Sequence, residues 1–151
     1  MKIRLLVAAA CTAAALSAMA CGSSSSSPSS SSSSSGACST IGPAPTTPST
    51  TPGGAVRTNT ITISNCVATP KDIIVTRGTQ VTFINNDSQT HEMTSNPHPE
   101  HTECPEINSA GFLTAGQQRA TSNMVTNRTV CGYHDHGLPN VAGLQGSISI
   151  Q

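Results

Sequence analysis

Two histidines, His134 and His136, stand two residues apart near the C-terminus, in a segment that also carries Cys131. On an extended strand this spacing points both imidazoles to the same face. Imidazole is the side chain that most often binds transition metals in proteins. A third histidine, His91, lies far upstream, where folding would bring it alongside the pair. The sequence therefore predicts a metal site made of His91, His134 and His136.

Further potential ligands accompany this set. His98 and His101 stand three residues apart in a proline-rich segment, and we expect them either to cap the same site or to form a second, weaker one. Asp135, between the paired histidines, is a candidate for orienting an imidazole N–H group, and its alternative is a solvated loop carboxylate. The affinity of such a site for divalent ions peaks at copper. Copper is therefore the expected cofactor.

The N-terminus predicts export. Lys2 and Arg4 precede an apolar run that ends in small residues just before Cys21. This pattern is typical of a signal peptide, here residues 1–20. Cys21 is followed by Gly22 and a serine tract, which resembles the bacterial lipoprotein arrangement in which the cysteine is lipidated; the alternative is an ordinary signal peptide. We predict a protein anchored to the membrane through Cys21 in the cell envelope, facing the periplasm or the outer surface.

The remaining chain divides into a linker and one domain. Residues 21–54 comprise Cys21 and a stretch rich in Ser, Thr and Pro, which predicts a disordered tether. Residues 55–151 are long enough for a single core. Because Lys2 and Arg4 belong to the leader, five basic side chains face seven acidic ones in the rest of the chain. This balance, with two Phe, one Tyr and no Trp, argues against nucleic acid as a partner.

The domain has the pattern of an all-β protein. Short runs of alternating or β-branched residues predict strands, and no stretch has a sustained helical period. Arg77–Thr79 has the composition of a tight hairpin turn between two of the runs. The predicted strands cover residues 58–64, 72–76, 80–85, 116–121, 129–134 and 146–150. These features predict a β-sandwich, and a purely structural or adhesive sandwich without a cofactor is the alternative to a metal protein.

Two segments carry a family resemblance. The pattern P..I.V..GT.VTF.NN....H, which runs from Pro70 to His91, resembles the first half of a cupredoxin such as plastocyanin. The ending from Ala142 to Gly146 is similar to the AGMxG segment that follows the ligand loop in that family. The resemblance covers most of residues 58–151. It implies a cupredoxin-like Greek-key β-sandwich that binds copper, with His91 as a ligand.

The chain departs from that family at the other ligands. Blue copper sites combine two histidines with a cysteine thiolate and a long axial thioether, but Leu144 stands at the methionine position here. The segment after Tyr133 lacks the expected cysteine, and Cys131 would lie on the strand face opposite His134 and His136.

This ligand set favours copper holding or delivery over electron transfer, and binding over enzymatic turnover. The expected partner is a redox or copper-transfer protein. Two alternatives remain open: an electron carrier that uses Cys131 as a thiolate ligand, and a copper-dependent redox enzyme with an open coordination position.

Four cysteines remain beyond the leader, and an even count in an exported domain favours disulfides. Four cysteines allow three pairings. We favour Cys104 with Cys131, because this bond would pin the histidine-rich loop against the strand that carries the ligands. Cys38 and Cys66 would then form the second pair.

Overall fold

The computed structural model describes Cys38 and residues 53–151. The predicted signal peptide, the predicted lipidation site and most of the Ser-rich linker lie outside the described residues. All described residues fall within one compact unit, Ser33–Gln151. The proposed domain start at residue 55 stays a prediction. Within the described residues, no helix has the length and apolar character that spanning a bilayer requires.

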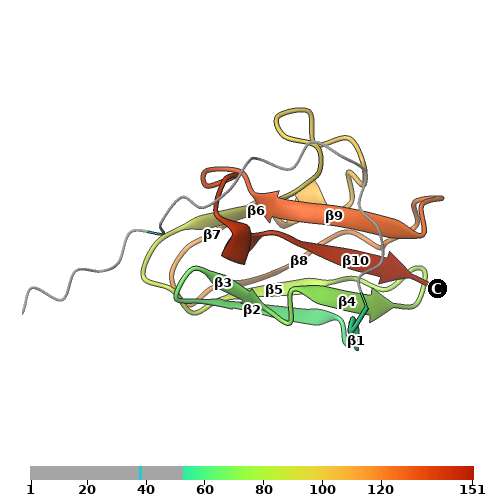
Figure 1. The fold of residues 1–151 in the computed structure, drawn as a ribbon, viewed down its shortest axis with the longest axis horizontal. Helices are drawn as coiled ribbons and strands as arrows, with labels where there is room; N and C mark the ends of the chain where they lie inside the picture. The colour runs from blue at the N-terminus through green and yellow to red at the C-terminus, as the bar shows by residue number, and fades with distance from the viewer. Residues whose placement is uncertain (1–37, 39–52) are drawn as a thin grey trace, which may run out of the picture. The chain divides into compact units, whose positions relative to one another are not determined.

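Ten strands in the described part of the chain form two sheets (Figure 1). The six-stranded sheet contains, in spatial order, β1 (Val56–Arg57), β4 (Asp72–Val75), β10 (Gly146–Ile150), β9 (Val130–Asp135), β6 (His91–Ser95) and β7 (Phe112–Leu113). The four-stranded sheet contains, in spatial order, β3 (Val67–Thr69), β2 (Thr60–Ser64), β5 (Thr82–Asn85) and β8 (Gln118–Ala120). Two short 3-10 helices, η1 (Ile107–Ala110) and η2 (Ala142–Leu144), complete the described elements.

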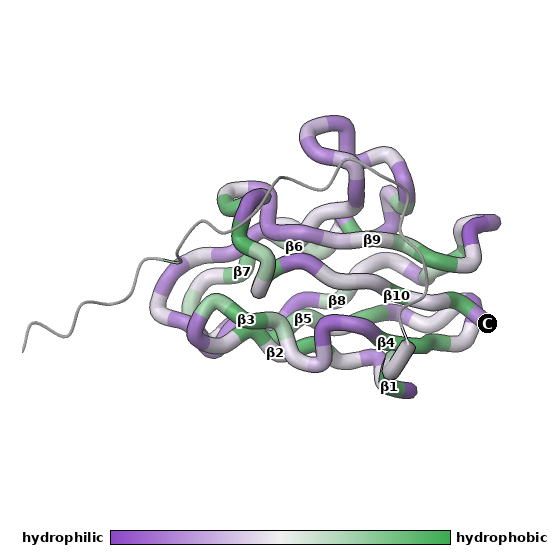
Figure 2. Tube along the Cα trace, in the orientation of Figure 1, coloured by the Kyte–Doolittle hydropathy of each residue, from purple (hydrophilic) through white to green (hydrophobic). Residues whose placement is uncertain are grey.

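Alternation of apolar residues explains why these segments pair as sheets. On β2, Ile61 and Ile63 are buried while Thr60 and Thr62 are only partly buried, and β4 and β5 alternate in the same way. Each sheet thus turns one apolar face inward. Across the interface the ring of Phe83 on β5 meets that of Tyr133 on β9 edge-on, with ring centroids 5.4 Å apart. Figure 2 shows the hydrophobic residues of β2 and β4 in green along the chain.

The predicted all-β two-sheet class is confirmed, and each of the six predicted segments contains a strand. The hairpin prediction at Arg77–Thr79 is wrong, because β4 and β5 belong to different sheets. The turn itself forms, with the Thr79 amide donating to the Thr76 carbonyl and with Gly78 at a φ of 85°. β4 instead pairs in parallel with β1 and β10, so the turn carries the chain from one sheet to the other.

Strand register determines which side chains share a face near β6 and β9. Met93 lies directly opposite Asp135, and Thr94 lies opposite His134. Residues opposite each other point to the same side of a sheet, and neighbours along a strand point to opposite sides. Asp135 therefore faces the interior with Tyr133, whereas His134 faces outward. The sheet separates these two groups of side chains.

Both predicted disulfides are present. Cys104 is bonded to Cys131 and Cys38 to Cys66. The first joins the end of the loop that follows β6 to the inward face of β9. The same loop, yellow in Figure 1 and mostly hydrophilic in Figure 2, projects beyond β6 and β9. Its base is closed by a hydrogen bond of 2.8 Å from the Glu103 amide to the Asn96 carbonyl.

Candidate metal centre

Three histidines from two distant segments gather on the outward face of the six-stranded sheet. His98 and His101 come from the loop after β6, and His136 follows the last residue of β9. Each offers one ring nitrogen, and these three atoms lie within 4.8 Å of one another. We call this group the outer-face triplet. It unites the two loop histidines with one member of the predicted site.

The triplet has the spacing of metal ligands at its tightest contact. His136 Nδ1 and His101 Nε2 are 3.2 Å apart. Two nitrogens bound at about 2.0–2.1 Å to one tetrahedral ion would be ~3.3 Å apart. Because the three ligand atoms lie within 4.8 Å of one another, side-chain rotation would have to bring them closer to complete such a set. The arrangement therefore fits an imidazole-bound metal with only a small adjustment.

His98 supplies a second indication of a bound ion. Its Nδ1 atom is buried and has no hydrogen-bond partner. A buried polar atom without a partner is costly, and such atoms are uncommon in folded proteins. The His98 ring also contacts the rings of His101, His134 and His136, with centroid distances of 5.5, 5.4 and 5.5 Å. A metal ion at this place would satisfy the unpaired nitrogen.

His134 forms the floor of the triplet. Its side chain is fully buried, and its ring lies 5.2 Å from that of His101 between centroids. Nδ1 donates to the Asn96 side-chain oxygen at 2.9 Å. This bond leaves Nε2 as the unprotonated nitrogen, and the Thr94 hydroxyl lies 3.4 Å from it. His134 thus supports the two loop histidines from below.

The backbone of the loop fixes His101. The residue adopts a left-handed conformation, with a φ of 52°, which is uncommon outside glycine and marks a position set by its surroundings. Its amide donates to the Pro97 carbonyl at 2.8 Å, and its carbonyl accepts from the Asn108 side chain at 2.9 Å. Asn108 also binds the Ser95 amide at the end of β6. These bonds hold the imidazole against its neighbours.

Electrostatics keeps part of this cluster neutral. Burial, together with repulsion from His101, His98 and His136, lowers the pKa of His134 to about 4. Burial, together with repulsion from His136 and His98, also lowers the pKa of His101. A neutral imidazole has a lone pair for a metal, so protons compete less strongly at these two rings near neutral pH.

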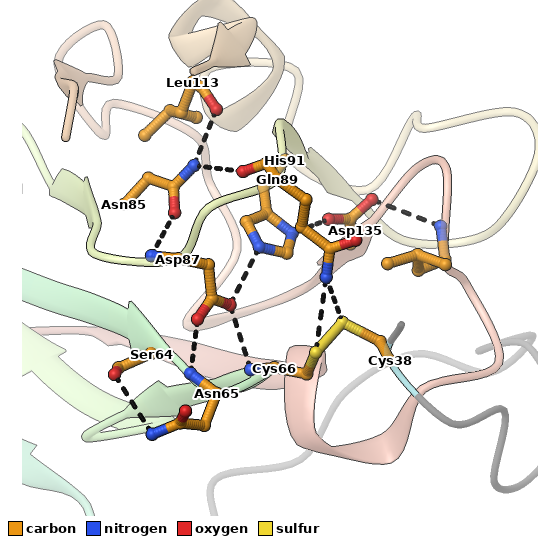
Figure 3. Close-up of polar contacts among 11 residues, drawn as sticks. Cys38, Ser64, Asn65, Cys66, Asn85, Asp87, Gln89, His91, Leu113 and Asp135 are labelled. Atoms are coloured by element: carbon orange, nitrogen blue, oxygen red, sulfur yellow. Dashed lines mark hydrogen bonds and ion pairs between the residues drawn. A yellow bond between two sulfur atoms is a disulfide. The ribbon is translucent and has the colours of Figure 1, made fainter. Parts of the chain in front are cut away.

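His91 lies apart from this cluster. It lies opposite Leu113 on the inward face of β6, which it shares with Met93, and is 1 % exposed. Both ring nitrogens already have partners: Nδ1 lies 2.5 Å from Asp135 Oδ2, and Nε2 lies 3.1 Å from Asp87 Oδ2. Figure 3 shows the imidazole between the two carboxylates. We call Asp87, His91 and Asp135 the interior triad.

The interior triad carries a charged imidazole. Burial alone would lower the pKa of His91, but the hydrogen bonds and negative charges of Asp135 and then Asp87 outweigh it, so the pKa is raised. Two carboxylates accept from the two ring N–H groups, which requires the protonated form. His91 therefore has no free lone pair for a metal ion in this arrangement.

The residues that the cupredoxin resemblance would assign to a blue copper site do not fit one. Cys131 faces the interior and is bonded to Cys104, so it offers no thiolate. Leu144 is buried at the position of the thioether. His91 is held by two carboxylates. The outer-face triplet, in contrast, fits a metal with nitrogen ligands.

The three predicted ligands thus have different surroundings. His136 lies in the outer-face triplet, His134 lies beneath it, and His91 lies on the other face of the sheet. Their roles as ligands stay predictions. The predicted loop disulfide already indicated that His98 and His101 would lie near the strand that carries His136. No sequence pattern predicted the interior triad, because β6 lacks an alternating apolar pattern.

No protein-family model matches the chain, and no curated protein matches it either. Solved structures of cupredoxins are similar to it. A purple cupredoxin from Nitrosopumilus maritimus has 18% identity and a TM-score of 0.45, over 61% of this chain and 98% of that one. Amicyanin from Paracoccus versutus has 14% identity and a TM-score of 0.46, over 66% of this chain and 84% of that one.

Proposed function

We propose that this protein binds copper through His98, His101 and His136, and that it holds or delivers the ion in the cell envelope. The observation that carries the proposal is the outer-face triplet, with ligand atoms within 4.8 Å of one another and an unpaired buried nitrogen on His98. Imidazole ligands suit copper, zinc and nickel, and intrinsic affinity among divalent ions is highest for copper.

The absence of a thiolate from the triplet favours copper holding over fast electron transfer. The electron-carrier alternative requires Cys131 as a free thiolate, whereas Cys131 is paired with Cys104 and faces the interior. Three imidazoles suit a tetragonal copper(II) site or a trigonal copper(I) site. His136 is the exposed member of the triplet. Exchange of copper with a partner protein would therefore begin at His136.

The location of this activity rests on the sequence. The leader up to residue 20 and the lipid anchor on Cys21 would place the domain at a membrane surface in the envelope. The disulfides support an oxidising compartment, because such bonds persist in exported proteins. A redox or copper-transfer protein in the same compartment is the partner that we propose.

Titration of the apo full chain with copper(II) tests the proposal. We expect one ion per chain, electron paramagnetic resonance hyperfine features of nitrogen ligands, and only weak visible absorption. Zinc titrated in parallel should bind more weakly, as the affinity order of divalent ions requires. The matched control is the triple variant H98A/H101N/H136A, which should lose the stoichiometric site. An intense thiolate-to-copper band, or unchanged binding by the triple variant, would refute the proposal.

A further inference from the structure

We propose that Asp135 is a positioning residue for the metal site, because its carboxylate fixes the turn that presents His136 to the outer-face triplet. This inference rests on the proposed copper-binding function. It assigns a task to a side chain that points away from the metal, into the space between the two sheets.

Asp135 caps the turn that follows it. Asp135 Oδ1 accepts from the Gly137 amide at 2.9 Å and from the Leu138 amide at 3.2 Å. A side-chain oxygen that binds amides two and three residues ahead folds the backbone into an Asx turn. His136 is the residue enclosed by this turn. Its own amide donates to the Glu92 carbonyl at 2.8 Å, which ties it to β6.

Asp135 is itself held in place by His91. Its other carboxylate oxygen, Oδ2, binds His91 Nδ1 at 2.5 Å, and both side chains are almost fully buried. A charge-assisted hydrogen bond of this kind is short and strong. With one oxygen held by His91, the second oxygen has a fixed direction toward the turn. The His91 side chain therefore acts on the turn that carries His136 through Asp135.

His91 is in turn connected to the four-stranded sheet through Asp87. His91 Nε2 binds Asp87, whose two oxygens accept from the amides of Asn65 and Cys66 between β2 and β3 (Figure 3). Cys66 is in turn bonded to Cys38. The contacts thus run from the four-stranded sheet through the interior triad to the turn that carries His136. The turn is tied to the rigid part of the fold on both sides.

Substitutions at Asp135 separate the capping of the turn from the negative charge. Asp135→Ala removes the cap of the turn and the negative charge. Asp135→Asn removes the charge but keeps a side-chain oxygen that can accept from the turn amides, and its NH₂ group can donate to neutral His91. Asp135→Glu keeps the charge but places the oxygen too far along the side chain to cap the same amides. We expect the affinity for copper(II) to fall about 10- to 100-fold in Asp135→Ala and Asp135→Glu, as for other residues that orient metal ligands. Asp135→Asn should stay close to the wild type.

The measurement is competitive copper(II) titration of each apo full-chain variant, with the electron paramagnetic resonance hyperfine coupling as a second readout. The coupling should shift in the Ala and Glu variants, which a loss of stability alone would not produce. Asp72→Ala is the matched control, since Asp72 accepts from the Ser147 hydroxyl on the same sheet at 2.8 Å and touches neither histidine group. Where Asp135→Ala fails to fold, the Glu and Asn variants carry the test.

Two results would overturn the positioning role. One is wild-type affinity and an unchanged spectrum in Asp135→Glu; the other is an equal loss in Asp135→Asn and Asp135→Glu. A wild-type chain that binds no copper would overturn the proposed function and this inference together. If the wild-type chain binds copper and all Asp135 variants bind it with the same affinity, only the inference is overturned.

Discussion

The two histidine groups of this domain lie on opposite sides of the six-stranded sheet, near β6 and β9, and differ in what satisfies their imidazole nitrogens. In the interior triad, two carboxylates bind both nitrogens of His91. In the outer-face triplet, imidazoles face one another and His98 Nδ1 has no partner. The carboxylates raise the pKa of His91, whereas burial and neighbouring imidazoles lower the pKa values of His101 and His134. The same side chain thus stabilises the fold at one site and is available to a metal at the other.

We expect the largest loss of stability when the interior triad is broken. His91→Ala leaves the carboxylates of Asp87 and Asp135 without their cation inside the domain. Removing one partner of a buried ion pair costs about 3–5 kcal/mol. We expect the free energy of unfolding of the apo protein to fall by that amount in urea titrations. His136→Ala, an exposed residue, should change it by no more than about 0.5 kcal/mol, and equal losses in both variants would remove the distinction.

Removal of the loop disulfide comes next. The double variant Cys104→Ala/Cys131→Ala should lose about 3 kcal/mol of stability and should also lose copper affinity, because the loop is released from β9. The matched variant Cys38→Ala/Cys66→Ala should lose stability while keeping copper affinity to within a few-fold. Urea titration and copper competition on both variants check this prediction. A similar loss of copper affinity in both would show that the loop bond has no special role.

Removal of one ligand tests the outer-face triplet directly. His136→Ala should weaken copper binding by at least ~100-fold, or about 2.7 kcal/mol. His91→Gln should weaken it by less than about tenfold, since the His91 side chain acts on the triplet indirectly, through Asp135. Competition titrations against a chelator of known affinity measure both. A greater loss in His91→Gln than in His136→Ala would reverse the assignment of ligands.

His134, beneath the outer-face triplet, and His91, in the interior triad, should also make stability depend on pH in opposite directions. Because the folded pKa of His134 is about 4, below its ordinary 6.5, the unfolded chain binds the extra proton, and this residue makes apo stability rise as pH rises from 4 to 6.5. His91 has a raised pKa, so its contribution is full below 6.5 and is lost as pH rises through the folded value. In plots of unfolding free energy against pH, His134→Gln should lose the rise between pH 4 and 6.5. His91→Gln should lose the fall at higher pH. Curves parallel to the wild type would contradict both directions.

The smallest effect concerns the backbone at His101. Its φ of 52° suits Asn better than Ala. His101→Asn and His101→Ala should lose copper affinity equally, but the Ala variant should be less stable by about 1 kcal/mol. Thermal unfolding of the two apo variants is the measurement. Equal stability would show that the loop relaxes to another conformation.

The sequence was most informative where a simple period or count applied. Alternating Ile61 and Ile63 predicted a strand, and the even cysteine count predicted disulfides. The pairing of Cys104 with Cys131 came from the expectation that it would pin the histidine-rich loop against the strand that carries the ligands. The position of His91 was harder to predict, because His91–Ser95 has no alternation that reveals a strand. Without that strand, the alternation that places His91 and Met93 on the same inward face as Asp135 could not be predicted. The predicted ligand set therefore combined residues from both faces of one sheet.

The outer cluster depended on tertiary placement in the same way. His98 and His101 lie in a loop whose path is fixed by contacts of Asn96, Asn108 and Glu103. None of these contacts follows from local sequence preference. The disulfide prediction indicated only the neighbourhood of the loop, and the approach of His101 to His136 required the folded chain.

The central claim is that the metal binds on the outer face of the sheet while His91 keeps both of its protons. Long-range nitrogen–proton correlation spectra of the histidine rings, recorded while the anaerobic full chain is titrated with copper(I), test it most directly. We predict that one nitrogen each of His98, His101 and His136 shifts on binding, whereas the His91 signals keep the pattern of a doubly protonated ring. Loss of a proton from His91 together with a metal-induced shift of its nitrogen would contradict the account.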